Sequence, residues 1–347
     1  MPKRVLLTGG NGFIGSHILS KLLEFPHFSV RCTVRSEATA TKLKADFHEN
    51  KAQLETFIVP IISTPGAYNE AVKSDRPFDL VIHTASPFGG GSGQSNFEFL
   101  DPSIKGTTEL LQAVKDHAPQ VTRVVYLSSS ASILDFSRVD APPAKVYTEA
   151  DWNPVTWEEA LVGDEATAYR ASKKFAEQAA WKFMDEKPKP KFDFVTLCPP
   201  ATFGPPVHSV NRIQDLNESN ARLWKLCNLG TASPVPRIPL HVQVDARDLA
   251  VAHIRAALIP SAGNKRIIIS GGQFNFQEIF DIVRSNFKEM ENRTTIGNPG
   301  VSSLAEGAYE YSNSQAKKVL GVEFRPFTET LIDTIQSILD IEKKESR

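Results

Sequence analysis

Val5-Leu6-Leu7-Thr8-Gly9-Gly10-Asn11-Gly12-Phe13-Ile14-Gly15 joins an apolar run to a glycine cluster and to the start of a helical pattern. This order predicts a strand, a tight turn and a helix. Glycines in the turn let the backbone approach a pyrophosphate at the helix N-terminus, where free N–H groups and the positive dipole end favour an anion. The spacing is Gly-x-x-Gly-x-x-Gly rather than the Gly-x-Gly-x-x-Gly of many dehydrogenases, so an ordinary turn remains an alternative for this motif alone. The candidate dinucleotide contacts in this loop are Gly9, Gly12, Phe13, Ile14 and Gly15.

The end of the next strand favours one cofactor over another. A helix over residues 12–25 and a strand over 29–34 complete a strand–helix–strand unit of about 30 residues, the size expected for nucleotide binding. NAD enzymes usually place Asp or Glu after this strand, on the ribose 2′-hydroxyl. Here Arg35 and Ser36 occupy that place. A cation and a small hydroxyl suit a 2′-phosphate, so we expect NADPH; the alternative for Arg35 is a solvated surface cation.

Strands and helices alternate over most of the chain, which is typical of an α/β fold with a Rossmann-type, doubly wound parallel sheet. We expect a dinucleotide-binding domain from residues 1–200 with a returning segment at about 241–260. A smaller C-terminal substrate-binding lobe would comprise about 201–240 and 261–347, because the prolines of residues 198–206 exclude a helix or a central strand there. The expected helices after the first are 38–49, 67–75, 101–116, 167–185, 211–228, 246–258, 276–287 and 328–341, and the expected strands are 54–62, 79–85, 121–128, 192–197, 242–244 and 266–270. Arg247 and Asp248 are candidates for an ion pair within one helix.

Composition excludes several classes of protein. The chain of 347 residues has 39 Lys and Arg against 40 Asp and Glu, so no global basic field would attract nucleic acid or an anionic membrane. Three cysteines lie far apart and form neither a disulfide framework nor a metal-binding pair. No apolar run approaches the length of about 18 residues that a membrane span needs, and the first strand leaves no room for a secretory signal. We expect a soluble cytoplasmic protein without a metal, either a monomer or a homodimer.

Tyr169 and Lys173 form a Tyr-x-x-x-Lys pair on an expected helix. Four residues make about one turn, so both side chains lie on one face. An ammonium group beside a phenol favours phenolate and lowers the pKa from its ordinary value near ~10. A hydroxyl from Ser128, Ser129 or Ser130, after the preceding strand, would complete the site, and we choose Ser129 because a strand alternates its faces. The pair alone is weak evidence, since chance matches on helices are frequent; the serines, the glycine loop and the order of elements make it specific.

The end of the strand over 79–85 is built from small residues. Thr84, Ala85 and Ser86 would let a flat cofactor pass over the strand ends, so they are further candidate cofactor contacts. His83 invites a catalytic interpretation, but a histidine in a buried strand is more often a core residue, and we favour that. The glycine-rich residues 89–93 form a flexible loop, which alone does not make a lid.

These residues resemble those of extended short-chain dehydrogenase/reductases, and more closely fungal NADPH-dependent methylglyoxal/ketone reductases, relatives of plant dihydroflavonol reductase. The likeness covers nearly the whole chain. It rests on the glycine loop, Ser129, Tyr169 and Lys173, together with the stretches 83–87, 152–154, 172–177 and 244–248.

The resemblance implies a role for each of several residues. Ser129, Tyr169 and Lys173 would be the catalytic triad, with Lys173 also holding the nicotinamide ribose, and a ketone or aldehyde would receive hydride from NADPH and a proton from Tyr169. Arg35 and Ser36 would meet the 2′-phosphate, helped by Lys42 because Thr39 stands where relatives have a lysine. The other implied cofactor contacts are Ile61, Ile62, Pro199 and Thr202, and the implied substrate-pocket residues are Phe88, Ser130, Leu134, Ala166 and Ala201. The last group includes smaller side chains than relatives carry, so we expect a roomier pocket that accepts larger ketones.

Other functions remain as alternatives. A nucleotide-sugar or steroid-type extended dehydrogenase/epimerase usually has Val-Tyr-Gly after its serine strand, whereas residues 131–135 read Ala-Ser-Ile-Leu-Asp. A cinnamoyl-CoA reductase would carry Asn-Trp-Tyr before its lysine, whereas Tyr169 follows Ala168 here. A non-catalytic NADP-sensing protein needs the glycine loop but not the triad.

Overall fold

The computed structural model describes residues 3–86, 95–139, 141–238 and 240–346. Its main feature is a parallel sheet of seven strands in the order β10-β7-β5-β4-β1-β2-β3. These strands are β1 (Lys3–Thr8), β2 (Phe28–Val34), β3 (Leu54–Ile58), β4 (Leu80–His83), β5 (Arg123–Leu127), β7 (Asp193–Cys198) and β10 (Arg266–Ile268). The strand order reverses direction between β1 and β4, and in such sheets ligands bind at the carboxyl ends of the strands beside this switch point.

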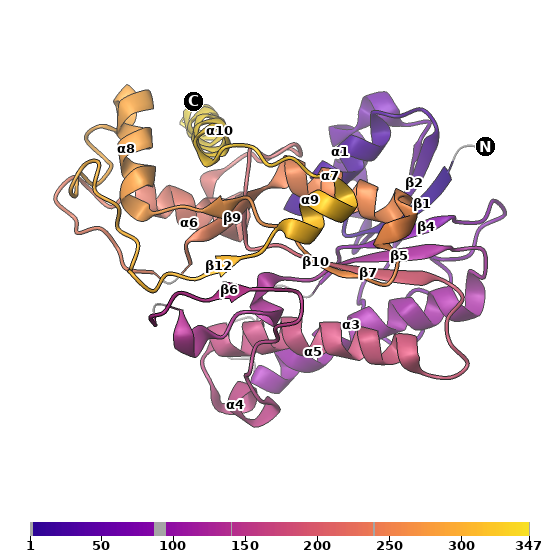
Figure 1. Cartoon of the computed structure of the whole chain (residues 1–347). Helices are drawn as coiled ribbons and strands as arrows, with labels where there is room; N and C mark the ends of the chain where they lie inside the picture. Colours follow the sequence, from indigo (N-terminus) through magenta and orange to yellow (C-terminus); the bar gives the residue numbers. More distant parts are fainter. Residues whose placement is uncertain (1–2, 87–94, 140, 239, 347) are drawn as a thin grey trace.

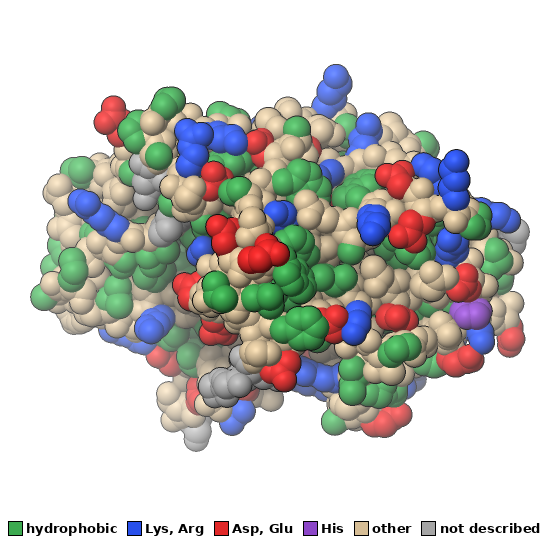
Figure 2. All heavy atoms as spheres, turned by 90° about the horizontal axis from the view of Figure 1, so that it is seen from below, with side chains coloured by type: hydrophobic (Ala, Val, Ile, Leu, Met, Phe, Trp, Pro, Cys, Tyr) green, Lys and Arg blue, Asp and Glu red, His purple; other side chains and the backbone are tan. Residues whose placement is uncertain are grey.

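Helices cover both faces of the sheet, as Figure 1 shows. One face packs against α1 (Phe13–Leu23), α7 (Ala246–Leu258) and α9 (Ser314–Leu320), and the other against α3 (Asn96–His117) and α5 (Glu165–Asp185). The central strands are buried on both faces, which explains their almost continuous apolar sequences. The predicted doubly wound α/β fold is therefore confirmed. Among the described residues on the face of α3 and α5, acidic and basic side chains are interspersed, and neither sign of charge dominates (Figure 2).

The C-terminal part has its own hydrophobic core. A three-stranded sheet contains β8 (Ala201–Phe203), β9 (Val242–Asp245) and β11 (Gly272–Gln273), with β9 in the middle. It packs with α6 (Glu218–Cys227), α8 (Phe276–Asn286) and α10 (Phe327–Glu345) around a separate cluster of buried side chains. A short pair, β6 (Val146–Tyr147) with β12 (Glu310–Tyr311), joins residues far apart in the chain. The predicted domain boundaries stay a prediction.

Several expected elements differ from the structure. The expected helix over 67–75 was wrong: these residues form successive turns, in which Asn69 N–H donates to Gly66 O while Val72 N–H donates to Tyr68 O. The mixed spacing of these bonds does not make a helical ladder, and Gly66, just before the expected helix, has a φ of +73° that belongs to a turn. The helix expected over 211–228 is confined to α6 and a short 3-10 turn, and α2 (Glu37–Asp46) and β3 end earlier than expected. The region over 145–161 contains β6 and the start of α4 (Trp157–Val162).

The expected ion pair between Arg247 and Asp248 was also wrong. Arg247 instead binds Asp245 at 2.7 Å and Asp333 at 2.6 Å, whereas Asp248 accepts hydrogen bonds from Arg325. Successive residues on a helix point in different directions, so their side chains do not face each other.

Candidate active site

The glycine loop lies between the carboxyl end of β1 and α1, beside the end of β4. Gly9 has a φ of +69°, and a side chain there would meet Ala85 N at 2.9 Å. A side chain at Gly15 would lie 2.1 Å from Gly9 O, so only glycine fits where the turn meets the helix. Gly12 is the N-cap of α1 and is exposed, and among the described residues no side chain caps the helix and no acidic residue lies in its first turn. This glycine cradle, which Phe13 and Ile14 continue into α1, fits the pyrophosphate of a dinucleotide.

The region expected to hold a 2′-phosphate lies next to this cradle. Arg35 is exposed, and within the described part of the chain it forms no salt bridge. Ser36 caps α2, accepting a hydrogen bond from Thr39 N–H at 3.3 Å. Lys42, the expected helper, donates to Asp46 at 3.1 Å and to Ser209 O at 2.6 Å, so a phosphate would compete with these partners. A cavity of about 390 Å³ opens here, lined in part by Asn11, Thr39, Lys42 and His208.

The end of β4 approaches the cradle closely. Thr84 donates its hydroxyl proton to Thr8 O at 2.6 Å, and Ala85 N–H donates to the Thr8 hydroxyl at 3.1 Å. His83 is buried, with its Nδ1 2.6 Å from the Thr8 hydroxyl, and burial lowers the pKa of its imidazole to about 3. A neutral, buried histidine agrees with its interpretation as a core residue. Ser86 is half-buried and accepts a hydrogen bond from Lys173 of α5.

Lys173 lies one turn after Tyr169 on α5, with its Nζ 5.6 Å from the centre of the Tyr169 ring. The Lys173 Nζ donates to Ser86 Oγ at 2.8 Å, and the residue is 9% exposed. Burial lowers the pKa of Lys173 to about 8, and among the described residues no carboxylate pairs with it. A buried cation without a carboxylate fits a site that receives a polar ligand.

Ser129 is the serine that the structure brings to Tyr169. Burial raises the pKa of the Tyr169 phenol, and a hydrogen bond with Ser129 opposes this rise. Ser128 instead points into the core and donates to Glu177 at 2.6 Å, and the backbone N–H of Ser130 donates to Pro199 O. Burial dominates the Tyr169 pKa in this structure, and the lysine ammonium points to Ser86; the lowering expected from Lys173 together with the cofactor's charge stays a prediction.

The remaining predicted residues are spread over several environments. Pro199 and Thr202 are buried at the end of β7 and in β8, Ile61 is 63% exposed, and Ile62 contacts the backbone of α3 at Gly106. Ser130 and Ala201 are half-buried, and Ala166 is exposed. Leu134 is 1% exposed within the core around Tyr147 and Tyr309, a position that does not support contact with a substrate. Phe88 and the loop over 89–93 lie outside the described residues.

Charged residues that the sequence interpretation missed lie close to the three candidate catalytic groups. Glu177 and Arg266 form a buried ion pair behind Ser129. Glu218 and Arg222 of α6, which pair with each other, also act electrostatically on Tyr169. A glutamate on the apolar face of α5 and an arginine at the start of the apolar run in β10 were the available signals.

Neither a metal centre nor a membrane span is found in the described part of the chain. No three His, Cys, Asp or Glu side chains there are grouped so that they could hold a metal ion. No helix there is both long and apolar enough to cross a bilayer. All three cysteines, Cys32, Cys198 and Cys227, are buried as free thiols.

Comparison with known proteins supports the fold and identifies the family. Residues 5–269 match the model of the NAD dependent epimerase/dehydratase family. The chain is 38% identical to the ketoreductase azaE of Aspergillus niger over 98% of both chains. It is 33% identical to the NADPH-dependent methylglyoxal reductase GRE2 of Saccharomyces cerevisiae, over 97% of this chain and 98% of the relative. The solved structure of yeast methylglyoxal/isovaleraldehyde reductase Gre2 complexed with NADPH has a TM-score of 0.90 to this structure, with 31% identity over 98% and 99% of the two chains. The chain therefore belongs to the NAD dependent epimerase/dehydratase family and is an oxidoreductase of the extended short-chain dehydrogenase/reductase type.

Proposed function

We propose that this oxidoreductase is an NADPH-dependent carbonyl reductase, which converts a ketone or aldehyde to an alcohol with Tyr169 as proton donor. The observation that carries the proposal is the meeting of Ser129 with the Tyr169 hydroxyl, one helical turn from Lys173 and beside the glycine cradle. Relatives described as a ketoreductase and as an NADPH-dependent methylglyoxal reductase, similar over nearly the whole chain, support this choice over an epimerase.

Residues already described would hold the cofactor, which supplies the hydride when it is bound. The N–H groups around Gly12 would bind its pyrophosphate, and Arg35 would meet the 2′-phosphate. Lys173, whose ammonium lies between Ser86 and the Tyr169 ring, would bind the ribose hydroxyls of the nicotinamide half.

The proton transfer would be made by the chain's own hydroxyls. Ser129 and Tyr169 would both donate hydrogen bonds to the carbonyl oxygen, stabilising the negative charge that develops on it. Burial raises the pKa of Tyr169, so the phenol stays protonated at neutral pH and has a proton to give. The Lys173 ammonium would then stabilise the phenolate that remains.

A carbonyl panel tests this function directly. The purified protein is mixed with NADPH and with small dicarbonyls, aliphatic ketones and aryl ketones, and the loss of NADPH absorbance is followed. We expect turnover that includes the aryl ketones. Tight NADPH binding without oxidation by any carbonyl would favour the sensor, whereas interconversion of nucleotide sugars would favour the epimerase. Activity limited to two- or three-carbon dicarbonyls would contradict only the expectation that the substrate pocket is large enough for bulky ketones.

Arg35→Ala is expected to raise KM for NADPH by about 10- to 100-fold, since a charge-assisted hydrogen bond contributes about 1.5–3 kcal/mol. KM for NADH should stay nearly unchanged, because NADH has no 2′-phosphate. Lys44→Ala is the matched control, because it removes a like charge from an exposed position on α2. Steady-state kinetics with both cofactors measure the effect. An equal rise in both KM values would mean that Arg35 does not recognise the 2′-phosphate.

A further inference from the structure

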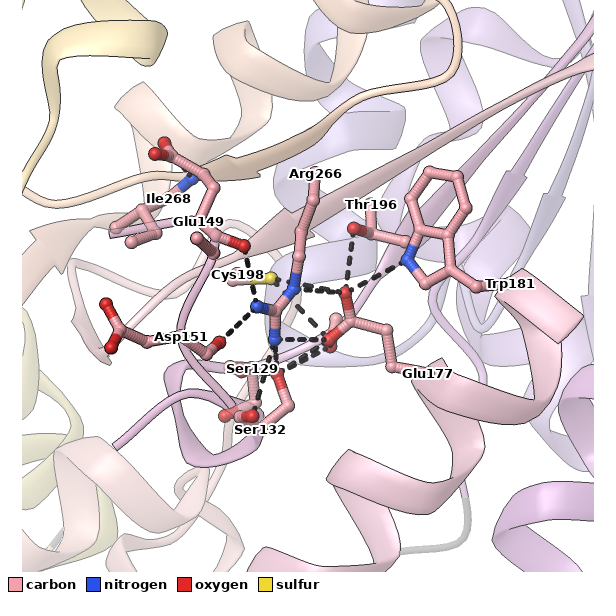
Figure 3. Close-up of polar contacts among 12 residues, drawn as sticks. Ser129, Ser132, Glu149, Asp151, Glu177, Trp181, Thr196, Cys198, Arg266 and Ile268 are labelled. Carbon is pink, nitrogen blue, oxygen red and sulfur yellow. Dashed lines mark hydrogen bonds and ion pairs between the residues drawn. The ribbon is translucent and has the colours of Figure 1, made fainter. Parts of the chain in front are cut away.

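A buried ion pair lies directly behind the loop that carries Ser129 (Figure 3). Glu177 is on α5, one turn after Lys173, and is completely buried. Arg266 is the first residue of β10, and its Nε donates to Glu177 Oε1 at 2.8 Å. Neither residue belongs to the set proposed above to touch cofactor or substrate.

The Glu177 carboxylate binds residues on both sides of Ser129. Its Oε2 accepts a hydrogen bond from Ser128 Oγ at 2.6 Å and lies 2.6 Å from Ser132 Oγ. The Ser132 hydroxyl is also 2.7 Å from Ser129 O, so its single proton can go to either acceptor. Thr196 of β7 donates to Oε1 at 2.9 Å. The carboxylate therefore joins α5, the serine loop and the end of β7.

Arg266 also binds the serine loop, through Ser132. Its Nη2 donates to Ser132 Oγ at 3.0 Å and lies 3.3 Å from Ser132 O. Its Nη1 donates to the backbone oxygens of Glu149 and Asp151, and its guanidinium carbon lies 3.7 Å from the centre of the Trp152 ring. Figure 3 shows Nε and Nη2 turned toward Glu177 and Ser132, and Nη1 turned toward Glu149 and Asp151.

Stability alone does not account for two charges in this position. Burial would raise the pKa of Glu177, but the Arg266 charge and the hydroxyl donors outweigh burial and hold the pKa below its ordinary value, so the carboxylate is ionised. A buried ion pair often contributes no more to folding than well-packed apolar side chains of the same volume, because both charges lose their hydration. What apolar side chains cannot supply is a fixed set of directed bonds to the serine loop.

We propose that Glu177 and Arg266 are positioning residues that keep the Ser129 hydroxyl within hydrogen-bonding distance of the Tyr169 hydroxyl. Glu177 binds the hydroxyls of Ser128 and Ser132, and Arg266 also binds Ser132. Because Glu177 is on the same helix as Tyr169 and Lys173, these bonds fix the position of the Ser129 hydroxyl relative to α5. The proposal rests on the proposed carbonyl reduction, in which Ser129 binds the carbonyl oxygen.

A double-mutant cycle between Glu177→Gln and Ser129→Ala tests this proposal. Glu177→Gln is expected to lower kcat for ketone reduction by about 10- to 100-fold, the cost of a misplacement of about 1 Å, with little change in KM for NADPH. In the Ser129→Ala background the same substitution should lower kcat no further, because the hydroxyl that it misplaces is already absent. Rates are expressed per NADPH-binding site, measured by fluorescence titration, so that unfolded protein does not count. The proposal would be overturned if the fold-loss of kcat in the double variant equalled the product of the losses in the two single variants.

A second ion pair between neighbouring strands, in which the arginine is buried and the aspartate is partly exposed, supplies the control. Arg123, buried at the amino end of β5, binds Asp193 of β7 at 2.8 Å and also donates to the carbonyl oxygens of Ala256 and Ile259. It is at the sheet edge opposite Ser129. Asp193→Asn should lower the melting temperature but leave kcat per site unchanged. A loss of kcat as large as that in Glu177→Gln would show that weakening any ion pair in the sheet lowers kcat, and would contradict a specific role for Glu177.

The outcomes separate this proposal from the proposed function. If the wild-type protein reduces no carbonyl, the proposed function fails, and the positioning role that rests on it fails with it. If it reduces carbonyls and the losses multiply, only the positioning role fails. Should Glu177→Gln not fold, Arg266→Lys and Ser132→Ala replace it in the same cycle with Ser129→Ala, with the same expected absence of additivity.

Discussion

Replacing Tyr169 with phenylalanine is expected to lower kcat for ketone reduction by about 10²- to 10⁴-fold, the usual contribution of a positioned general acid. Phenylalanine keeps the ring, whose centre lies 6.4 Å from that of Phe99, and removes only the hydroxyl that meets Ser129. NADPH binding should therefore persist, since the Lys173 ammonium and the glycine cradle are unchanged. Single-turnover reduction measures the chemical step, and fluorescence titration measures the binding.

Tyr68→Phe is the control for loss of a buried phenol. Tyr68 is completely buried, and its hydroxyl has no hydrogen-bond partner among the described residues. Its substitution should leave kcat unchanged. Turnover by Tyr169→Phe at a rate near that of the wild type would contradict the assignment of Tyr169 as proton donor and would direct the search to another acid near Ser129.

The sequence predicted those elements that short-range patterns determine. Helix α7 has the bounds expected for it, 246–258, because Asp245 caps its first turn and alanines and apolar residues recur at helical spacing. The seven parallel strands were expected because short, mostly apolar runs alternate with helical patterns along the chain. Residues 67–75 instead form turns whose backbone hydrogen bonds mix three- and four-residue spacings, which composition does not reveal.

The parts of the site that the sequence could not predict depend on distant contacts. Arg266 and Glu177 are 89 positions apart, and their pairing requires β10 to lie beside β7. Lys42 is bound by Ser209, 167 positions away, which its place on α2 does not indicate. The rise in the Tyr169 pKa depends on burial by several segments, which the Tyr-x-x-x-Lys spacing does not reveal.

Lys173→Met is expected to abolish most activity and yet to stabilise the folded protein. Activity should fall by about 100-fold or more, because the variant lacks the charge that stabilises the Tyr169 phenolate and binds the cofactor ribose. Stability should rise, because the pKa of Lys173 is lowered by burial from 10.5 to about 8, so the charged form is disfavoured in the folded state. At about 1.4 kcal/mol per pKa unit the relief is about 3 kcal/mol, reduced to about 1–2 kcal/mol by loss of the hydrogen bond to Ser86.

The pH dependence of this gain distinguishes relief of a buried charge from better packing. Between pH 8 and 10.5 the unfolded chain keeps the Lys173 proton while the folded protein has released it, so wild-type stability rises with pH in this window. The stabilisation of Lys173→Met relative to the wild type should therefore be full below about pH 8. It should fall through zero to a small loss as the pH approaches 10.5, because only the lost hydrogen bond to Ser86 then remains. Urea unfolding at several pH values measures it, with Lys182→Met, an exposed lysine of α5, as the control that should show no such gain. A gain independent of pH would mean that the methionine merely packs better, and a loss of stability at neutral pH would mean that the Lys173 ammonium is already well paired without the cofactor.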